Sequence, residues 1–233
     1  MSVIKRVMLK LSGEALQDEH NPFNEKEIQK IAEQVKALYD KNVEIGVVIG
    51  GGNIWRGRTG TEIDRPKSDS IGMLATVMNA VYVSEFFRQQ GMPTAILSPL
   101  PFANITEQFS KDRTMEYFKQ GKVLFFAGGT GHPYFSTDMA MALRAVEIEA
   151  DVILAAKNID GVYDKDPGKH PDAKRYDKIS IDEVVAKELG VIDLAASILL
   201  KENRIPMRIF KLNAENGIAK AVDEDFDGTE VTV

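Results

Sequence analysis

The chain alternates short apolar runs with longer amphipathic stretches, and this alternation limits the fold more than any other feature of the sequence. Most of the short runs are apolar on both faces. Such runs are typical of strands that are covered on both sides, as in a parallel sheet. They predict strands at residues 7–11, 45–49, 95–97, 123–127, 152–156 and 206–210.

The amphipathic stretches between these runs have the spacing of helices. Parallel neighbours in a sheet need a connection of about a dozen residues or more, which a helix supplies. We therefore predict an α/β fold, a three-layer α/β/α sandwich with a mainly parallel central sheet. The predicted helices are 25–40, 72–90, 111–119, 137–148, 180–187 and 194–202.

Nothing in the sequence divides the chain into independent parts. It has no internal repeat, no low-complexity tract and no Pro/Ser-rich linker, so we expect a single domain over residues 1–233. A chain of this length buries enough surface to fold without a disulfide or a structural metal.

Composition excludes several classes of protein. The absence of cysteine excludes a disulfide scaffold, a cysteine nucleophile, a thiolate zinc site and an iron–sulfur cluster. A net charge of −6 without a basic block argues against nucleic-acid binding. No apolar run approaches the roughly 18 residues of a membrane span, and the start of the chain does not resemble a signal peptide. We expect a cytoplasmic protein whose anionic ligands meet local positive charge.

Four loops that follow predicted strands are rich in glycine or polar groups. Ligands of such folds bind at the carboxyl ends of the strands. Glycine lets backbone amides approach a phosphate closely, and a following helix start adds partial positive charge. Each loop alone is equally consistent with a simple turn, but all four at one sheet edge predict an anion site. They are residues 10–13, 50–53, 128–132 and 157–161.

The common phosphate-binding motifs are missing. The chain has no Gly-x-x-x-x-Gly-Lys-Ser/Thr, and Tyr134 stands where a dinucleotide fingerprint that starts at Gly129 would have glycine. The His-Arg-Asp and Asp-Phe-Gly motifs of protein kinases are absent as well. If the protein transfers phosphate, it belongs to another class.

Three basic residues are candidates for phosphate binding. Lys10 is either a solvated lysine at a strand end or the ammonium that neutralises a transferring phosphoryl group, beside the amides of Ser12 and Gly13. Arg56 and Arg58 follow the triple glycine and could clamp phosphates with planar guanidinium groups. Alone, each arginine would more often be a surface residue.

Residues 130–138 allow two interpretations. Ser136, Thr137 and Asp138 are typical of a helix N-cap. Alternatively, the amides and hydroxyls of residues 130–137 bind a second phosphate or a base, while an acidic residue orients Mg²⁺ or lysine. His132 is expected to make a local backbone contact. Trp55, beside Arg56, is either a pocket wall or a core plug, and we favour a structural role.

Residues 160–167 also allow two interpretations. The turn residues of this segment indicate a hairpin. Alternatively, Tyr163 offers a stacking face for a purine, and Asp166 an acceptor for its ribose or amino group.

Taken together, these segments resemble the amino acid kinase family, and within it the bacterial UMP kinases, over essentially the whole chain. The resemblance implies Mg²⁺-dependent transfer of the ATP γ-phosphoryl group to UMP, giving UDP and ADP in pyrimidine nucleotide (CTP/UTP) biosynthesis. It also implies a homohexamer. The resembling segments are residues 7–15, 47–57, 69–79, 130–138 and 160–167.

The resemblance assigns roles to individual residues, with the N-terminal part mainly binding UMP and the C-terminal part mainly binding ATP. The ATP site would comprise Lys10, Leu11, Ser12, Gly13, Gly52, Arg56, Asn158, Tyr163 and Asp166, and Lys157 could share the base site. The UMP site would comprise Gly51, Asp69, Thr130, Gly131, His132, Pro133, Tyr134, Phe135, Ser136 and Thr137. Catalysis would depend on Lys10, Arg56, Asp138 and Asp193, and Mg²⁺ would arrive with ATP.

Residues 18–24 depart from the family pattern. Many members carry a glycine-rich stretch there that is associated with activation by GTP, whereas this segment has no glycine. GTP is therefore a possible activator only. Inhibition by UTP is an expectation from the family.

Two other functions fit parts of the sequence. Another amino acid kinase would share the ATP half but phosphorylate a carboxylate or carbamate, and Asp69 with residues 130–137 suits a nucleotide better. A uridine-nucleotide sensor without turnover would not need Lys10 or Arg56, and both are present. No helix-turn-helix or basic stripe supports DNA contact by such a sensor.

Overall fold

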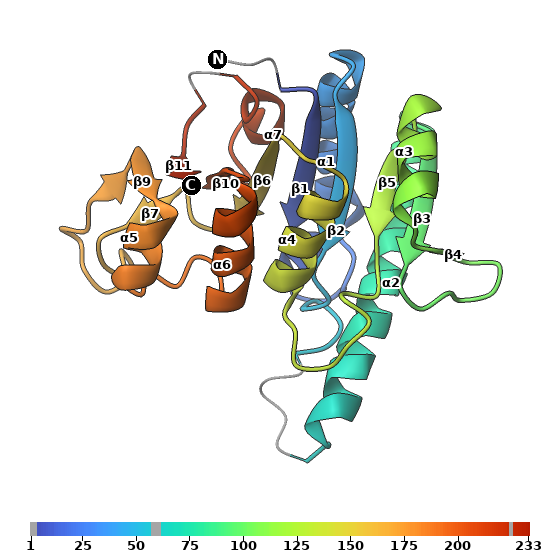
Figure 1. The fold of residues 1–233 in the computed structure, drawn as a ribbon, viewed down its shortest axis with the longest axis horizontal. Coiled ribbons are helices and arrows are strands. Elements are labelled where there is room, and N and C mark those ends of the chain that lie inside the picture. Colours follow the sequence, from blue (N-terminus) through green and yellow to red (C-terminus); the bar gives the residue numbers. More distant parts are fainter. Residues whose placement is uncertain (1–3, 57–61, 224–225) are drawn as a thin grey trace.

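A computed structural model of the chain describes residues 4–56, 62–223 and 226–233 (Figure 1). Its described residues form a central nine-stranded sheet in the order β4-β3-β5-β2-β1-β6-β10-β11-β9, and among these strands only the β10–β11 pair is antiparallel. The predicted fold class is therefore confirmed. The strands are β1 (Arg6–Leu11), β2 (Glu44–Ile49), β3 (Thr94–Ser98), β4 (Glu107–Gln108), β5 (Val123–Phe126), β6 (Val152–Lys157), β9 (Lys178–Ser180), β10 (Met207–Lys211) and β11 (Thr229–Thr232).

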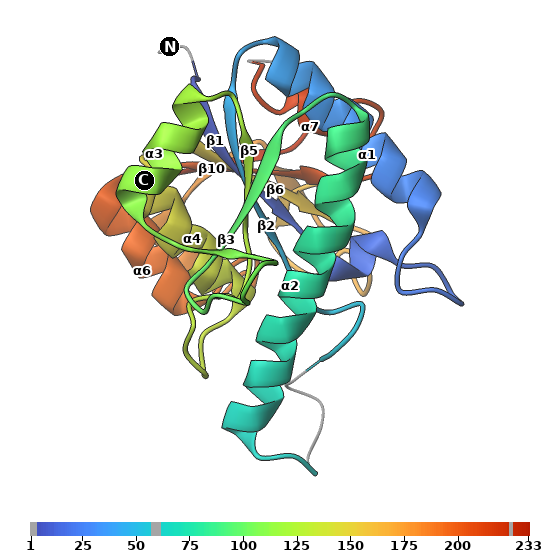
Figure 2. The same cartoon turned by 90° about the vertical axis from the view of Figure 1, so that its right-hand side faces the viewer.

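Helices cover both faces of the sheet. Figure 2 shows α1, α2 and α7 on one side, and α3, α4 and α6 on the other. The side chains of β1 alternate accordingly: Val7, Leu9 and Leu11 pack with one set of helices, and Met8 packs with the other. The helices are α1 (Glu25–Asp40), α2 (Arg65–Gln89), α3 (Lys111–Lys119), α4 (Thr137–Glu147), α5 (Ile181–Ala186), α6 (Leu194–Asn203) and α7 (Gly217–Lys220), with a 3₁₀ turn at Gly13–Leu16.

Side-chain caps explain where several helices begin. Asn24 accepts the backbone N–H of Glu27 at the start of α1, and Ser110 accepts that of Arg113 at the start of α3. Helix α2 begins at Arg65, well before the predicted start at residue 72. Its first turns are polar and lie beyond the edge of the sheet (Figure 2), so no apolar periodicity marks them.

Helix α2 also corrects the expectation that no apolar run approaches the length of a membrane span. An 18-residue window within it reaches a mean hydropathy of 1.3, and 44% of that window is buried inside the protein. The helix packs on the sheet through Val77, Ala80, Val83 and Phe87. A helix in the core of a globular protein has these properties too, so the length and composition of α2 are weak support for a span.

A small hairpin lies outside the central sheet. Strand β7 (Val162–Tyr163) pairs antiparallel with β8 (Arg175–Tyr176), as the turn residues of segment 160–167 predict. The buried Thr229 hydroxyl of β11 accepts the backbone N–H of Val162 and donates to the carbonyl of Tyr176. One side chain of the central sheet therefore fastens both strands of the hairpin.

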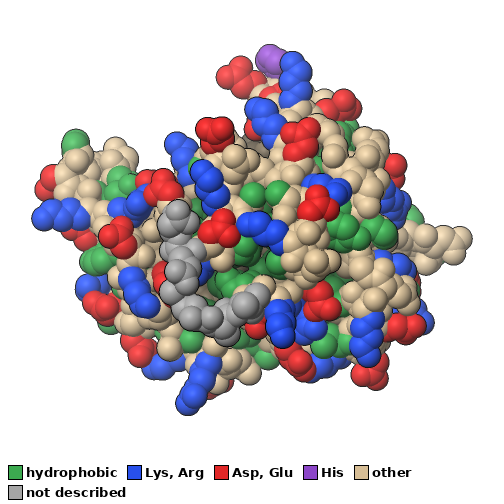
Figure 3. Space-filling view, turned by 90° about the horizontal axis from the view of Figure 1, so that it is seen from above, with side chains coloured by type: hydrophobic (Ala, Val, Ile, Leu, Met, Phe, Trp, Pro, Cys, Tyr) green, Lys and Arg blue, Asp and Glu red, His purple; other side chains and the backbone are tan. Residues whose placement is uncertain are grey.

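The face at the amino ends of the central strands carries basic and acidic side chains side by side (Figure 3). Ion pairs such as Arg6–Glu44 and Lys111–Glu149 lie here. This is a solvated, mixed-charge surface, and the glycine-rich loops lie at the opposite edge.

Candidate active site

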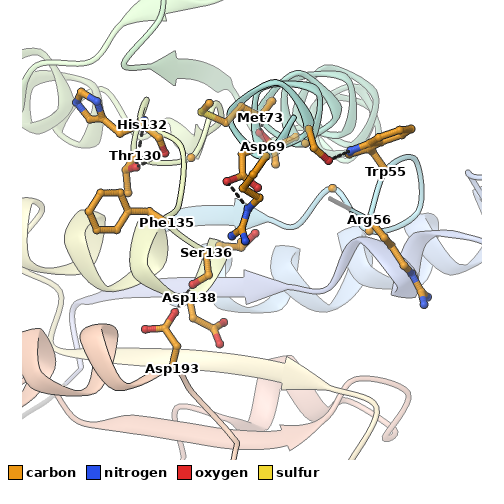
Figure 4. A pocket seen from close by; sticks show the side chains of 18 of the residues that line it. Trp55, Arg56, Asp69, Met73, Thr130, His132, Phe135, Ser136, Asp138 and Asp193 are labelled. Atoms are coloured by element: carbon orange, nitrogen blue, oxygen red, sulfur yellow. Dashed lines mark hydrogen bonds and ion pairs between the residues drawn. The ribbon is translucent and has the colours of Figure 1, made fainter. Parts of the chain in front are cut away.

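A cavity of about 620 Å³ opens at the carboxyl edge of the sheet (Figure 4). Its walls come from the loop after β2, the first turns of α2, the loop after β5 with the start of α4, and the loop before α6. Segments far apart in the sequence thus meet at one place. The predicted site residues that line it are Gly51, Gly52, Arg56, Asp69, Thr130, His132, Phe135, Ser136, Thr137, Asp138 and Asp193.

Lys10 and Asp138 form an ion pair with a 3.2 Å separation between Nζ and Oδ1. Both side chains are mostly buried. Lys10 is on β1 at the centre of the sheet, and Asp138 is in the first turn of α4. The carboxylate fixes the ammonium at the carboxyl end of β1, which fits the hypothesis that Asp138 orients a lysine.

A second lysine lies close to this pair. Lys157 ends β6 and donates from Nζ to the carbonyl of Val191. Burial lowers its pKa; the nearby Asp138 raises it, and Lys10 lowers it further. The Asp138 carboxylate therefore acts on two lysines, Lys10 and Lys157, at the carboxyl ends of neighbouring strands.

The glycines after β1 and β2 allow their loops to touch. A Cβ on Gly13 would lie 2.3 Å from the carbonyl oxygen of Gly50 and 2.8 Å from the amide nitrogen of Gly52. Buried Asn79 of α2 donates to the carbonyl of Gly50 at 2.7 Å and exchanges amide hydrogen bonds with Asn53. The two loops are thus held together by close packing, independent of any ligand.

Arg56 has a carboxylate partner in this structure. Its guanidinium lies 2.8 Å from Oε1 of Glu14; the arginine side chain is 57% exposed and the glutamate side chain 39%. In Figure 4 the Arg56 side chain points away from Ser136 and Asp138. The structure therefore places Arg56 at the rim of the cavity and does not bring its guanidinium to the Lys10–Asp138 ion pair. Arg58 lies outside the described residues.

Asp69 joins α2 to the loop after β5. Its Oδ2 accepts the backbone N–H of Tyr134 at 2.8 Å and lies 2.8 Å from Nε of Arg65. Tyr134 and Phe135 are exposed, and Pro133 between them and His132 is half-buried. The Thr130 hydroxyl accepts the backbone N–H of His132, which is the local contact expected for this histidine loop.

Ser136 and Asp193 are both helix caps and both line the cavity. The Ser136 hydroxyl caps α4 by accepting the N–H of Met139, and Asp193 caps α6 by accepting the N–H of Ala196. The N-cap interpretation of Ser136 is thus correct. Its hydroxyl also donates to Asp193, so two helix N-termini meet at the cavity. Their partial positive charge favours an anion.

The residues predicted for the ATP base lie elsewhere. Asn158, Tyr163 and Asp166 follow β6 or belong to the hairpin segment and do not line the cavity described above. The Tyr163 hydroxyl donates to Asp160, which raises the tyrosine pKa. Leu11, predicted for the ATP site, is fully buried in the core, so only its backbone can face a nucleotide.

Sequence reasoning assigned no ligand role to several wall residues. The Trp55 indole donates to Ser68 at 3.0 Å, and the Thr76 hydroxyl accepts the N–H of Gly128 at 2.8 Å. Had a helix been predicted from residue 65, its spacing would have indicated the wall residues of α2, because they share the helix face of Asp69. The wall residues of α2 are Arg65, Ser68, Asp69, Gly72, Met73 and Thr76.

The acidic residues of the cavity suit a metal ion that is held mainly by its ligand. Within the described residues, no group of three or more His, Asp or Glu side chains is placed to hold a metal. Asp138 and Asp193 both supply carboxylates to the cavity, and Asp138 pairs with Lys10. Mg²⁺ is commonly bound by one or two carboxylates together with substrate phosphates, so these residues fit Mg²⁺ bound to a nucleotide.

Comparisons with known proteins agree over almost the whole chain. The sequence profile of the amino acid kinase family matches residues 5–211. A solved UMP kinase from Bacillus anthracis is 33% identical, with a TM-score of 0.96 over 99% of this chain and 97% of that one. A UMP kinase from Ureaplasma parvum is 32% identical, with a TM-score of 0.94 over 99% of each chain. A uridylate kinase from Archaeoglobus fulgidus is 26% identical, with a TM-score of 0.76 over 97% of this chain and 99% of that one.

Proposed function

Because the chain belongs to the amino acid kinase family, we propose that it is a UMP kinase, which transfers the γ-phosphoryl group of ATP to UMP to give UDP and ADP. The full-length likeness to two bacterial UMP kinases carries this proposal. The cavity beside the Lys10–Asp138 pair supports it, because it offers an open pocket for a phosphorylated acceptor next to the Lys10 ammonium.

The main physical difficulty of this reaction is the repulsion between two polyanions. The chain itself has a net charge of −6, so positive charge must be concentrated at the site. Lys10 and the loop amides would stabilise the charge on the transferring group, while the two nucleotide sites hold an in-line geometry. An ionised phosphate oxygen of UMP is the nucleophile, so no general base is required.

We assign Mg²⁺ as the metal that accompanies ATP. When bound, the ion would supply positive charge that offsets the negative charge of the ATP phosphates. Asp138 and Asp193 are the carboxylates of the cavity that would face it, and Asp138 also orients Lys10. Arg56 would add a contact to the phosphates once its guanidinium leaves Glu14.

The two nucleotides would occupy different halves of the carboxyl edge. UMP would bind Gly51, Asp69 and the loop 130–137, at the cavity between α2 and α4. ATP would extend from the loop 10–13 and Gly52 toward Asn158, Tyr163 and Asp166, on the β6 side of β1. Lys10, on the strand between these halves, is suited to act on the group that passes from one nucleotide to the other.

We further propose that the protein is a cytoplasmic homohexamer of pyrimidine nucleotide biosynthesis that UTP inhibits. Exposed Leu74, Met78 and Val81 form an apolar stripe on α2 that suits a subunit contact. In segment 18–24, the Asp18 carboxylate accepts the amides of His20 and Asn21, and Asn53 donates to the carbonyl of Pro22. This compact turn replaces the glycine-rich stretch, so GTP activation is to be tested by adding GTP to the UMP reaction.

A coupled assay of ADP release with Mg·ATP tests the function. UMP, CMP, dUMP, carbamate, aspartate and glutamate are offered separately as acceptors. We expect release with UMP and none with the amino acids or carbamate. Release with carbamate or an amino acid alone would reassign the acceptor, and binding of UMP without release in any reaction would favour a nucleotide sensor.

A further inference from the structure

We propose that Arg65 is a positioning residue for the acceptor nucleotide. It holds Asp69 and the loop that carries Tyr134 in the arrangement that receives UMP. This inference rests on the proposed function, because it deepens the acceptor half of the same site. Arg65 is the first residue of α2, and its side chain lines the cavity.

The first contact is through the Asp69 carboxylate. Oδ2 of Asp69 lies 2.8 Å from Nε of Arg65 and accepts the amide of Tyr134 at 2.8 Å. Only 15% of the Asp69 side chain is exposed, against 41% of Arg65. A largely buried carboxylate needs a cation or hydrogen-bond donors beside it. Arg65 therefore helps to fix the carboxylate that also fastens the loop.

The second contact is through the Tyr134 ring. The Arg65 guanidinium lies 5.5 Å from the centre of this ring, within the range of a cation–π interaction. Tyr134 has φ +71°, in the left-handed region that tyrosine rarely adopts. The surrounding contacts must maintain such a backbone conformation. Arg65 supplies one such contact directly, at the Tyr134 ring. Through Asp69 it supports a second, the hydrogen bond from the Tyr134 amide.

These contacts make the acceptor loop ready for its ligand. A nucleotide that binds an already ordered loop does not bear the entropy cost of ordering it. Without Arg65, both the orientation of Asp69 and the Tyr134 contact weaken. Lys10 and Asp138 lie on β1 and α4 and are held by each other. Loss of Arg65 should therefore weaken UMP binding with little change in the phosphoryl-transfer step.

The test compares Arg65→Ala and Arg65→Lys with the wild-type full chain. We expect Arg65→Ala to raise both the KM and the calorimetric Kd for UMP about tenfold, which corresponds to about 1.4 kcal/mol. The kcat and the KM for ATP should stay within about twofold of wild type. Arg65→Lys keeps the charge but lacks the planar guanidinium, so it should restore part of the affinity.

Lys187→Ala is the matched control. Lys187 also combines an i,i+4 ion pair, with Glu183 at 3.0 Å, and a tyrosine contact, 5.3 Å from the centre of the Tyr176 ring. It lies at the end of α5 and does not line the cavity. This variant should leave UMP affinity unchanged. Hydrogen exchange of peptides covering residues 128–137 should accelerate in Arg65→Ala and not in Lys187→Ala.

Two outcomes would overturn the inference. One is an Arg65→Ala protein with wild-type affinity for UMP. The other is an equal loss of affinity for ATP and UMP together with a lower unfolding temperature, which would indicate a general structural role. Wild-type protein that neither binds nor phosphorylates UMP would instead contradict the proposed function, so the two failures are distinguishable.

Discussion

Three cationic side chains of the candidate site already have a carboxylate partner within the chain. Lys10 pairs with Asp138, Arg56 with Glu14, and Arg65 with Asp69. The degree of burial differs: the first pair is mostly buried, and the Arg56 pair is much more exposed. The buried pair is suited to fixed positioning, whereas the exposed pair can exchange its carboxylate for a phosphate at little cost.

Replacing Lys10 by Ala should lower kcat far more than it weakens UMP binding. The ammonium lies at the end of β1, where charge would develop in the transition state, and such donors typically contribute about 10²- to 10³-fold to kcat. Single-turnover kinetics and UMP calorimetry measure the two effects. Lys41→Ala, which removes an exposed pair with Asp223, is the control. Near-normal turnover of a folded Lys10→Ala protein would refute the assignment.

Glu14→Gln should lower the KM for ATP by about two- to threefold, because the carboxylate no longer competes with phosphate for Arg56. Arg56→Ala should act in the opposite direction and raise this KM. Initial rates at varied ATP and saturating UMP measure both. If Glu14→Gln raises the KM for ATP as Arg56→Ala does, the ion pair supports the active arrangement instead of competing with it.

The sequence predicted the backbone neighbourhood of the site better than its side-chain directions. Residues 51, 69 and 130–138 follow strands or start helices, so sheet topology alone brings them to one edge. The direction of Arg56 depends on Glu14, which is brought near by the close packing of Gly13 against the triple-glycine loop. No spacing rule in a single sequence contains that contact.

At the scale of elements, the strands of the centre were predictable and those of the periphery were not. The six predicted strands are buried on both faces and all are present. Strands β4, β7 and β8 have two residues each, too few for a hydrophobic period. The turn residues of segment 160–167 indicated a hairpin, but its strand positions depend on tertiary partners such as Thr229, for which local sequence carries no signal.

Thr229→Val should loosen the hairpin and raise the KM for ATP, with the KM for UMP unchanged. The substitution leaves the Val162 N–H and the Tyr176 carbonyl without their hydroxyl partner, which costs about 1–3 kcal/mol for a buried group. Thr229→Ser keeps the hydroxyl, so it should restore both the stability of the hairpin and the wild-type KM for ATP. Thr232→Val on the same strand removes only a contact of 3.5 Å and is the control. An unchanged KM for ATP would separate the hairpin from the ATP site.

The Asp160 contacts of the hairpin should make its stability depend on pH. Burial raises the Asp160 pKa, but hydrogen bonds from Tyr163 and its own backbone, with the charge of Arg175, lower it below 3.8 overall. At pH values between the folded and the unfolded pKa of Asp160, the folded chain therefore binds fewer protons than the unfolded chain. The contribution of Asp160 to the free energy of unfolding is complete above its unfolded pKa and is lost as the pH falls through its folded pKa.

Asp160→Asn tests this dependence. Because the ion pair between Asp160 and Arg175 is partly exposed, we expect a loss of about 0.5–1 kcal/mol in the free energy of unfolding at pH 7. The difference from wild type should shrink as the pH falls below 3.8. Urea unfolding at a series of pH values measures it. A difference that is constant across the series would exclude the carboxylate charge as its cause.

At the scale of the whole molecule, the exposed stripe on α2 predicts assembly. Met78 is 54% exposed in the middle of a helix whose other face is in the core. Met78→Glu should shift the particle mass measured by light scattering to a smaller species, because a charge would be buried in the subunit contact. Ile198→Glu, on α6 at 50% exposure, is the control and should retain the wild-type mass. An unchanged mass for Met78→Glu would exclude α2 as the contact.

The central position of β1 has a consequence for synthesis of the chain. This strand is made before both of its neighbours, β2 and β6, and β6 ends only at Lys157. On the ribosome, one edge of β1 therefore waits unpaired until most of the chain has emerged. An apolar edge that stays open is prone to wrong pairing. We therefore expect chaperones to protect this protein while it is being translated and folds slowly. Low stability of the finished fold would not be the reason for their action.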